Sequence, residues 1–314
     1  YDSLILDGTT LYGTTASGGP MNLGTVFKIE TDGSGFTLLH GFAMSDGGLP
    51  ACRLLKDGTT LYGMTSAMGA SSGGNIFKIE TDGSGFQVMH SFAGGGTDGK
   101  SPFGSLIQSG TTLYGMTREG GDANVGTIFK IETDGSGFTL LHEFAGGADD
   151  GKTVNGSLLL DGTTLYGMTR MGGDSDCGVI FQIETDGSGF ELLREFVGGV
   201  NDGHDPFGSL IKDGDRLYGM TNLGGDSNNG VIFYHQLPST ASITVTSPNG
   251  GENWETNSLQ DITWTSQGIV NDVKIEYSID NGTSWLTIIP STDNTGGFNW
   301  TVPDTPSESC LVRI

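Results

Sequence analysis

The chain has 314 residues, enough for two domains, and its 55 glycines follow no collagen-like period, so we expect them in turns between strands. Its formal net charge of −23 argues against nucleic acid and anionic membrane surfaces as partners, because phosphate would be repelled. The chain contains no run of 18 apolar residues, so the sequence does not predict a membrane-spanning helix. Its three cysteines have no spacing typical of a disulfide framework or a zinc site.

A unit of about 52 residues is repeated five times between residue 1 and about residue 236. The sequence LYG recurs with steps of 50, 52, 52 and 52 residues, and the sequence IF or VF recurs with the same steps. The tyrosines are Tyr12, Tyr62, Tyr114, Tyr166 and Tyr218, and the phenylalanines are Phe27, Phe77, Phe129, Phe181 and Phe233. Self-similarity at a fixed period of this length is typical of a protein built from repeated structural units.

Each of the first four repeats contains four short runs of strand length, and no repeat contains a run with helical periodicity. In the third repeat these runs read GSLIQSG, TTLYGMT, GTIFKIE and GFTLLHEF, and we name them strands A to D. Four antiparallel strands in a repeat of this length are typical of one blade of a β-propeller. The predicted fold of residues 1–237 is therefore an all-β propeller of at least five four-stranded blades.

The turn between strands C and D reads TDGSG in each of the first four repeats. Its aspartates can bind their own backbone and its glycines supply positive φ angles; the aspartates are Asp32, Asp82, Asp134 and Asp186. One carboxylate gives too few oxygen ligands for calcium, so we interpret the motif as a structural turn. Strand D carries histidine in three repeats, at His40, His90 and His142, which favours a structural role over a catalytic one.

Strand order predicts that the B–C and D–A loops lie on one face of the propeller, which we name the loop face. These loops differ between repeats, and ligands of propellers and barrels usually bind at such loop-rich ends. Planar donors beside carboxylates can recognise sugar hydroxyls. We therefore predict ligand contacts from Arg118, Asp122, Arg170, Asp174, Asp176, Asn222, Asp226 and His204.

Many carboxylates on one face could also bind a cation. The candidate calcium ligands are Asp98, Asp150, Asp202 and Asp205, together with the acids of the B–C loops. A solvated acidic surface explains the same residues equally well. No nucleophile–base pair or pair of acids stands out, so the sequence predicts no catalytic residue.

Composition changes after a short linker at residues 238–241. All four tryptophans, Trp254, Trp264, Trp285 and Trp300, lie in the last part of the chain. Runs with period-two alternation between turns predict an immunoglobulin-like β-sandwich over residues 242–314. We expect Trp264, Tyr277, Trp285 and Trp300 to form its core.

Two stretches resemble known families. The pattern GSLIxDGTTLYGMTxxGG followed by GTIFKIETDGSGFTLLH resembles the GloVer tandem repeat of bacterial "choice-of-anchor" surface proteins and covers about residues 1–236. The C-terminal stretch, with SPNGGENW, ITWTS and VKIEYSIDNGTSWLTI, resembles the Ig-like domain shared with yeast cell-wall glucan-assembly and Ser/Thr-rich anchored proteins. These resemblances imply an exported, extracellular or surface-attached protein with no known catalytic residues.

The fifth repeat has strands A to C but no strand D, and the sandwich has no seventh strand after residue 314. Exposed strand edges are templates for pairing with another chain. Either flanking residues complete these edges or neighbouring molecules do. We expect a non-enzymatic surface protein that binds glycan or extracellular matrix, and the alternative is a structural subunit that binds copies of itself by strand complementation at its open ends.

Overall fold

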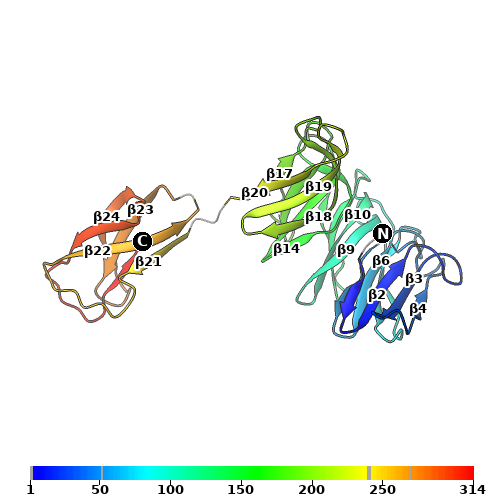
Figure 1. Ribbon diagram of the computed structural model, residues 1–314, viewed down its shortest axis with the longest axis horizontal. Coiled ribbons are helices and arrows are strands. Elements are labelled where there is room, and N and C mark those ends of the chain that lie inside the picture. The colour runs from blue at the N-terminus through cyan, green and yellow to red at the C-terminus, as the bar shows by residue number, and fades with distance from the viewer. Residues whose placement is uncertain (1–2, 51, 239–241, 269) are drawn as a thin grey trace. The chain divides into compact units, whose positions relative to one another are not determined.

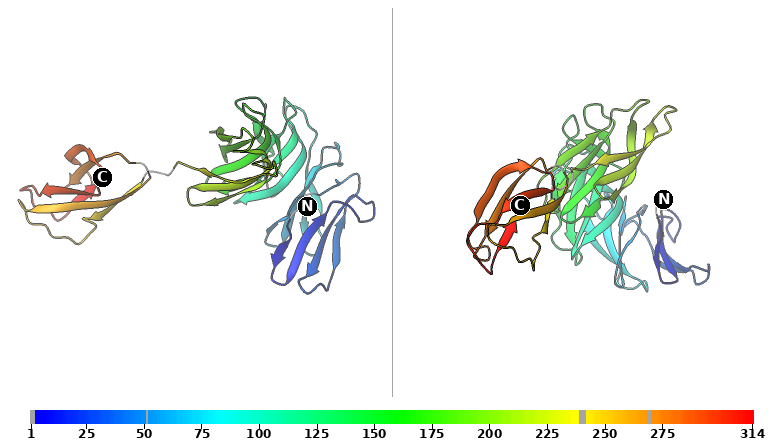
Figure 2. Two further views of the ribbon diagram at one scale, coloured as in Figure 1. Left: turned by 45° about the horizontal axis from the view of Figure 1, so that its top comes forward. Right: turned by 60° about the vertical axis from the view of Figure 1, so that its left-hand side comes forward.

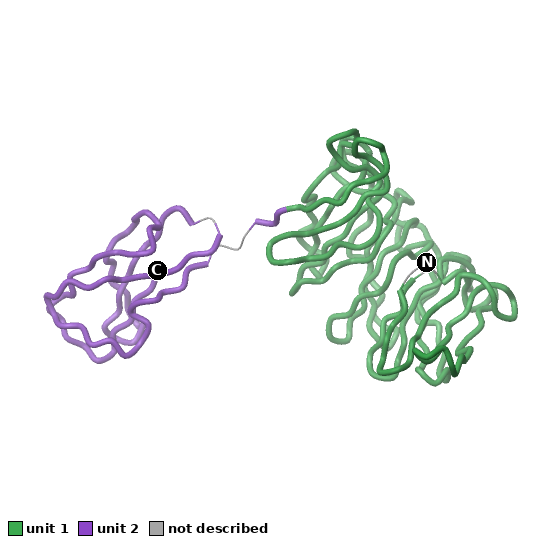
Figure 3. The backbone as a smooth tube through the Cα atoms, in the orientation of Figure 1, with its two compact units in different colours: residues 1–235 green, residues 236–314 purple. Residues whose placement is uncertain are grey.

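The computed structural model describes residues 3–50, 52–238, 242–268 and 270–314. Every named element within these residues is a β-strand, so the chain is all-β. Among the described residues there is no helix long and apolar enough to cross a membrane. The chain divides into two compact units, Tyr1–His235 and Gln236–Ile314 (Figure 3). Residues 239–241 of the expected linker lie outside the described residues.

The first unit consists of five small antiparallel sheets that follow one another along the chain (Figure 1). Sheet 1 contains β1 (Ile5–Asp7), β2 (Thr10–Thr15), β3 (Thr25–Glu30) and β4 (Thr37–Gly41). Sheet 2 contains β5 (Leu55–Asp57), β6 (Thr60–Thr65), β7 (Asn75–Glu80) and β8 (Gln87–Ser91). Sheet 3 contains β9 (Gly99–Ser109), β10 (Thr112–Gly120), β11 (Thr127–Glu132) and β12 (Thr139–Glu143). In all three, neighbouring strands are also consecutive in sequence, as expected for strands A to D.

The last two sheets depart from this pattern. In sheet 4 the expected strand A corresponds to β14 (Leu159–Asp161), and an additional strand, β13 (Gly151–Val154), lies in the expected D–A loop; both pair with β15 (Thr164–Gly172). The sheet continues with β16 (Val179–Glu184) and β17 (Glu191–Glu195). Sheet 5 has three described strands, β18 (Gly203–Asp213), β19 (Arg216–Gly224) and β20 (Ile232–Gln236).

The invariant glycine of LYG has a steric reason. Gly115 pairs with Phe129 on the neighbouring strand, and a Cβ atom at Gly115 would lie 2.5 Å from the Phe129 ring. The ring therefore packs over the glycine, which leaves no room for a side chain at this position.

Hydrophobic cores lie between consecutive sheets. The core between sheets 2 and 3 combines Met64, Ile76 and Phe92 with Leu113 and Phe129. Equivalent residues form the cores between sheets 1 and 2 and between sheets 3 and 4. In each of the first four repeats, the phenylalanine that directly follows strand D contacts the strand-C phenylalanine of the next sheet. The distances between ring centroids are 5.2 Å for Phe42–Phe77, 5.3 Å for Phe92–Phe129, 5.4 Å for Phe144–Phe181 and 4.9 Å for Phe196–Phe233.

The row of sheets is open in the described residues. Sheet 1 exposes Leu4 and Phe36 on one face, and sheet 5 exposes Met220 and Ile232 on the other. Figure 2 shows the first and last sheets at the two ends of the row. The small antiparallel sheets are thus shown, whereas closure into a propeller is not.

The second unit consists of two three-stranded antiparallel sheets. One contains β21 (Ser242–Ser247), β22 (Leu259–Gln267) and β25 (Gly297–Thr301), and the other contains β23 (Asp272–Ser278), β24 (Leu286–Asp293) and β26 (Leu311–Arg313). The buried residues Ile262, Trp264, Val273 and Ile275 form its core, with Trp254 and Trp300 among those packed against it.

The core includes neither Trp285 nor Tyr277, which are both half-buried, so the predicted core position is wrong for these two residues. The indole N–H of Trp285 donates to the carbonyl oxygen of Gly282 at 3.1 Å, and the Arg313 guanidinium lies 4.0 Å from the ring centroid. The short turn before β24 keeps this ring beside Arg313. Tyr277 is half-buried, and its ring lies 5.0 Å from that of Trp300.

Candidate functional site on the loop face

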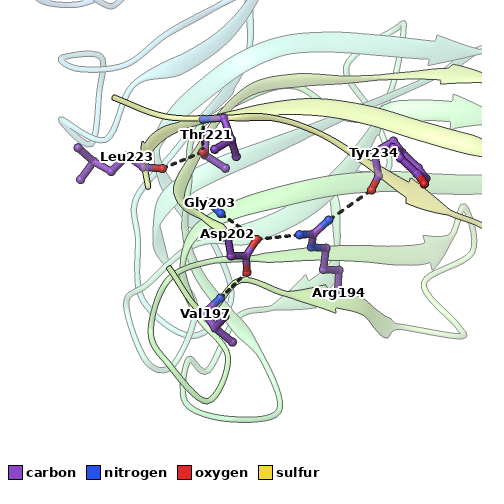
Figure 4. A network of polar contacts seen from close by, with 8 residues as sticks. Arg194, Val197, Asp202, Gly203, Thr221, Leu223 and Tyr234 are labelled. Carbon is purple, nitrogen blue, oxygen red and sulfur yellow. Dashed lines mark hydrogen bonds and ion pairs between the residues drawn. The ribbon is translucent and has the colours of Figure 1, made fainter. Parts of the chain in front are cut away.

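Each D–A loop is tied to strand D by one aspartate. Its carboxylate accepts a hydrogen bond from a backbone N–H at the start of the loop and contacts a basic side chain on strand D. The pairs are Asp46–His40 at 3.2 Å, Asp98–His90 at 3.0 Å, Asp150–His142 at 3.2 Å and Asp202–Arg194 at 2.7 Å. Figure 4 shows the last of these networks, in which the Val197 N–H donates to Asp202 at 2.8 Å.

The strand-D histidines also join neighbouring sheets. The ring of His40 stacks on that of Phe86 in sheet 2, with a centroid distance of 3.7 Å. His90 and His142 stack in the same way on Phe138 and Phe190. Burial lowers the pKa of His40, while the Asp46 carboxylate acts in the opposite direction. The recurrent histidine is thus a structural contact in all three repeats.

These networks bear on the predicted calcium ligands. Asp98, Asp150 and Asp202 already accept backbone N–H groups and face a basic side chain, which leaves fewer lone pairs for a hard cation. Across the described part of the chain, no three His, Cys, Asp or Glu residues are grouped to hold a metal ion. The calcium site stays a prediction.

The structure brings two of the predicted ligand-contact residues, Arg170 and Asn222, together with one candidate calcium ligand, Asp205. Arg170 on β15 donates through Nε to Asp205 Oδ1 in the next sheet at 2.6 Å, and Asn222 Nδ2 donates to Asp205 Oδ2 at 3.3 Å. The Asp205 side chain is 5% exposed, whereas that of Arg170 is 44% exposed. We name Arg170, Asp205 and Asn222 the sheet 4–5 cluster.

One repeat earlier, an equivalent arginine makes a different contact. Arg118 Nη2 donates to Asn155 Oδ1 at 3.0 Å, and its guanidinium lies 4.4 Å from the centroid of the Phe103 ring. Burial and the nearby charge of Arg170 lower the pKa of Arg118. Two arginines therefore lie side by side on the loop face, each bridging two sheets.

Asp205 occupies a backbone position, near the start of β18, that recurs in the other repeats. It has a φ angle of 63°, and Leu49, Ser101 and Thr153 at the equivalent positions also lie in the left-handed region. Their N–H groups donate to the carbonyl oxygens of Leu23, Gly73, Val125 and, for Asp205, Cys177 in the preceding sheet's loop. The strained backbone is thus a repeated structural device, whereas a carboxylate at this position is particular to sheet 5.

The other predicted ligand residues lie apart from the cluster. Asp176 contacts Lys152 at 2.9 Å and caps Gly172, and these contacts, the hydrogen bond from Lys152 first, lower its pKa. The N–H groups of Asp122 and Asp174 donate to Glu143 and Glu195. Asp226 is exposed and His204 is half-buried near Asp176.

Sequence reasoning did not identify Asn155 or Phe103. Both occupy the position of Phe207 in their own repeats, so the 52-residue spacing offered a way to find them. Nothing in the sequence showed that an arginine would reach across to the next sheet.

The repeats can be compared with known proteins. The model of the Gloeobacter/Verrucomicrobia repeat matches residues 1–158 and 96–284. The chain belongs to this family. No curated protein matched its sequence.

Several solved structures resemble this Gloeobacter/Verrucomicrobia repeat protein weakly. A nidogen/laminin complex is 16% identical, with 67% of each chain covered and a TM-score of 0.44. Oligogalacturonate lyase in complex with manganese is 13% identical, covering 76% of this chain and 65% of that one, with a TM-score of 0.46. A putative 6-phosphogluconolactonase from Bacteroides uniformis is 13% identical, covering 97% and 98%, with a TM-score of 0.43. Likenesses at this level carry no argument about function.

The Gloeobacter/Verrucomicrobia repeats also form a groove of about 570 Å³ along their A strands. One residue per repeat lines it at equivalent positions: Ser3, Arg53, Ser105, Ser157 and Ser209. Serine hydroxyls here accept backbone N–H groups from the preceding repeat, from Arg53 to Ser105 at 3.1 Å, from Ser105 to Ser157 at 2.7 Å and from Ser157 to Ser209 at 3.2 Å. The serines therefore join successive A strands.

Proposed function

We propose that this chain is a non-enzymatic, exported surface protein that recognises a glycan or extracellular matrix through the loop face of a β-propeller. In this proposal the five sheets are blades, because each is a small antiparallel sheet that packs face to face on the next. The second unit is an Ig-like sandwich, because it has two three-stranded sheets around Trp264.

The observation that carries the proposal is the sheet 4–5 cluster. Asp205 holds the Arg170 guanidinium through Nε, and the Arg170 side chain is 44% exposed, so its Nη groups can donate to a ligand. Asn222 adds an exposed amide beside it, and Phe207 is 51% exposed on the same strand as Asp205. A planar cation, an amide and an aromatic ring suit a sugar, which presents both hydroxyls and apolar C–H groups.

A glycan array probed with the whole chain tests this proposal. We expect Arg170→Ala and Asn222→Ala each to weaken binding of any retained glycan by at least about tenfold. Arg313→Ala is the matched control, because Arg313 is also a half-exposed arginine paired with a carboxylate, but in the second unit. Equal binding by all variants, or an array without retained glycans, contradicts the proposal. Recovery of cleaved glycan contradicts its non-enzymatic part.

A second candidate is a structural subunit that assembles by strand complementation. It is favoured by sheet 5, which has three described strands and ends at β20, whereas sheets 1 to 3 have four. An excess of a peptide with the strand-D sequence FTLLHEF should stop such assembly. Continued assembly in the presence of that peptide contradicts strand complementation.

Export and attachment to a bacterial surface are part of the first proposal. Fractionation of cells that express the chain in its natural context, with antibody detection, tests them. We expect the chain outside the cell, and recovery with the cytosolic fraction contradicts export.

A further inference from the structure

The two ends of the row of sheets each expose an apolar face whose counterpart is buried inside the row. The C-terminal end face belongs to sheet 5 and contains Ile211, Met220 and Ile232. The N-terminal end face belongs to sheet 1 and contains Leu4, Leu11, Phe27, Ile29 and Phe36. We keep these two names below.

The C-terminal end face is exposed at positions that internal sheets bury. Ile232 is 81% exposed, and the residues equivalent to it, Val26, Ile76, Ile128 and Ile180, are all 0% exposed. Met220 is 57% exposed, whereas Met64 and Met116 are 1% exposed. Exposure therefore follows from the lack of a neighbouring sheet in the described residues and not from a change of residue type.

The N-terminal end face shows the same contrast. Leu4 is 45% exposed, while its equivalents Leu54, Leu106 and Leu158 are each 3% exposed. Phe36 is 63% exposed, while its equivalents Phe86, Phe138 and Phe190 stack on a histidine of the preceding sheet.

The two end faces are the two halves of one internal core. Between sheets 2 and 3, Met64 and Ile76 pack against Leu106, Leu113, Phe129 and Ile131. Between sheets 3 and 4, Met116 and Ile128 pack against Leu158, Leu165, Phe181 and Ile183. The end faces carry the same residues at the same positions, with Met220 and Ile232 on one and Leu4, Leu11, Phe27 and Ile29 on the other.

We propose that the C-terminal end face binds the N-terminal end face of a second copy of this chain, in the manner of an internal junction. Exposed apolar patches of this kind mark interaction sites, and a second copy supplies the side chains that internal sheets already pack against. Because the two faces are different, the contact is head-to-tail and can continue into a longer assembly. This inference goes beyond glycan recognition and applies to the open row of sheets that the structure describes, because in a closed propeller the two end faces would cover each other within one chain. It involves sheet faces rather than strand edges.

This contact should be weaker than an internal junction. Sheet 5 has no fourth strand among the described residues, so it offers no counterpart of Phe92, which contacts Phe129 inside the row. Each copy also carries a formal net charge of −23. We therefore expect reversible association that strengthens with protein concentration and with added salt, because salt screens repulsion between copies.

Sedimentation velocity of the whole chain and two face variants tests the proposal. Ile232→Asp places a charge on the C-terminal end face, and Leu4→Asp places one on the N-terminal end face. Both side chains are already exposed, so both variants should fold, which far-UV circular dichroism checks. Val200→Asp, a loop position that is 61% exposed, is the matched control.

We expect the unchanged chain and Val200→Asp to associate, and each face variant alone to have a dissociation constant at least about tenfold higher. An equimolar mixture of the two face variants should form a heterodimer that grows no further, because each variant retains one intact face. Association that persists in both variants, a mixture that stays monomeric, or an unchanged chain that is monomeric at every concentration and salt level overturns the proposal. Loss of association on adding the strand-D peptide, with both face variants unaffected, would assign it to strand edges instead.

Discussion

Phe129 and Trp264 are both buried, but they belong to cores of different construction. Phe129 lies between two consecutive repeats and packs against residues of sheet 2. Trp264 lies in the single core of the second unit, between that unit's own two sheets. A core shared by neighbouring repeats must use side chains that fit at every junction, which accounts for the near-identical LYG and IF sequences. A core that occurs once can use a large, individually placed tryptophan.

The largest expected effect comes from breaking a shared core. Phe129→Ala removes a fully buried ring and should lower the free energy of unfolding of the first unit by about 3–5 kcal/mol. Urea denaturation followed by far-UV circular dichroism measures this change. Tryptophan fluorescence reports on the second unit alone, because all four tryptophans lie there.

The matched control is Phe36→Ala, because this ring is exposed in sheet 1. We expect Phe36→Ala to lower the free energy of unfolding of the first unit only slightly. Equal destabilisation by both substitutions would mean that the shared cores do not stabilise the repeats.

A smaller effect tests the single core. The indole N–H of Trp264 donates to Asn294 Oδ1 at 2.6 Å, and Asn294→Ala leaves this buried donor without that acceptor. We expect a loss of about 1–3 kcal/mol from the free energy of unfolding of the second unit, measured by tryptophan fluorescence. Asn299→Ala, at an exposed position on β25, should change it little. If Asn294→Ala lowered the free energy of unfolding of the first unit only, the role of this hydrogen bond in the second unit's core would be contradicted.

A pH-dependent effect should appear in the first unit. Because burial lowers the pKa of His40, the unfolded chain binds more protons than the folded chain just below the ordinary histidine pKa. The contribution of neutral His40 to the stability of the first unit is therefore complete above pH 6.5, the ordinary histidine pKa, and is lost as pH falls through the lowered pKa of His40. We expect His40→Gln to flatten the rise of thermal stability between about pH 5 and pH 7. If thermal stability rose more steeply with pH in His40→Gln than in the unchanged chain, the predicted direction of the His40 effect would be wrong.

The smallest effect should come from an exposed turn of the second unit. Hydrogen bonds from Ser284 and Ser278 lower the pKa of Asp280 from 3.8 to about 2. This contribution is present above pH 3.8 and is lost as pH falls toward 2. Asp280→Asn should make the fluorescence-monitored stability less dependent on pH in that range. If stability fell with pH in the same way in Asp280→Asn and in the unchanged chain, the Asp280 turn would not contribute to the stability of the second unit.

The repeated strands could be predicted from the sequence because strand formation here depends on residues close together in the chain. Period-two alternation and the spacing of LYG and IF located strands B and C of every repeat, and the alternating runs after residue 241 also form strands in the second unit. The extra strand β13 in sheet 4 was not predicted, because its residues Gly151–Val154 lie in the stretch assigned to the D–A loop, and the Asn155–Gly156 pair that follows it is a turn signal.

Contacts between sheets could not be predicted in the same way. The pairing of Arg170 with Asp205 joins residues 35 positions apart in different sheets, and it depends on how one sheet packs on the next. Trp254 packs against the core of the second unit although it was not among the predicted core residues, whereas Trp285 was predicted there and does not.

Sharing each core between neighbouring sheets also affects how such a gene can change length. Insertion or deletion of one whole 52-residue unit would recreate the same Met, Ile, Leu and Phe contacts at the new junction, so no core would need compensating substitutions. Near-identical coding segments are favourable substrates for unequal recombination. Natural variants of this protein are therefore expected to differ by entire units more readily than by insertions within a strand.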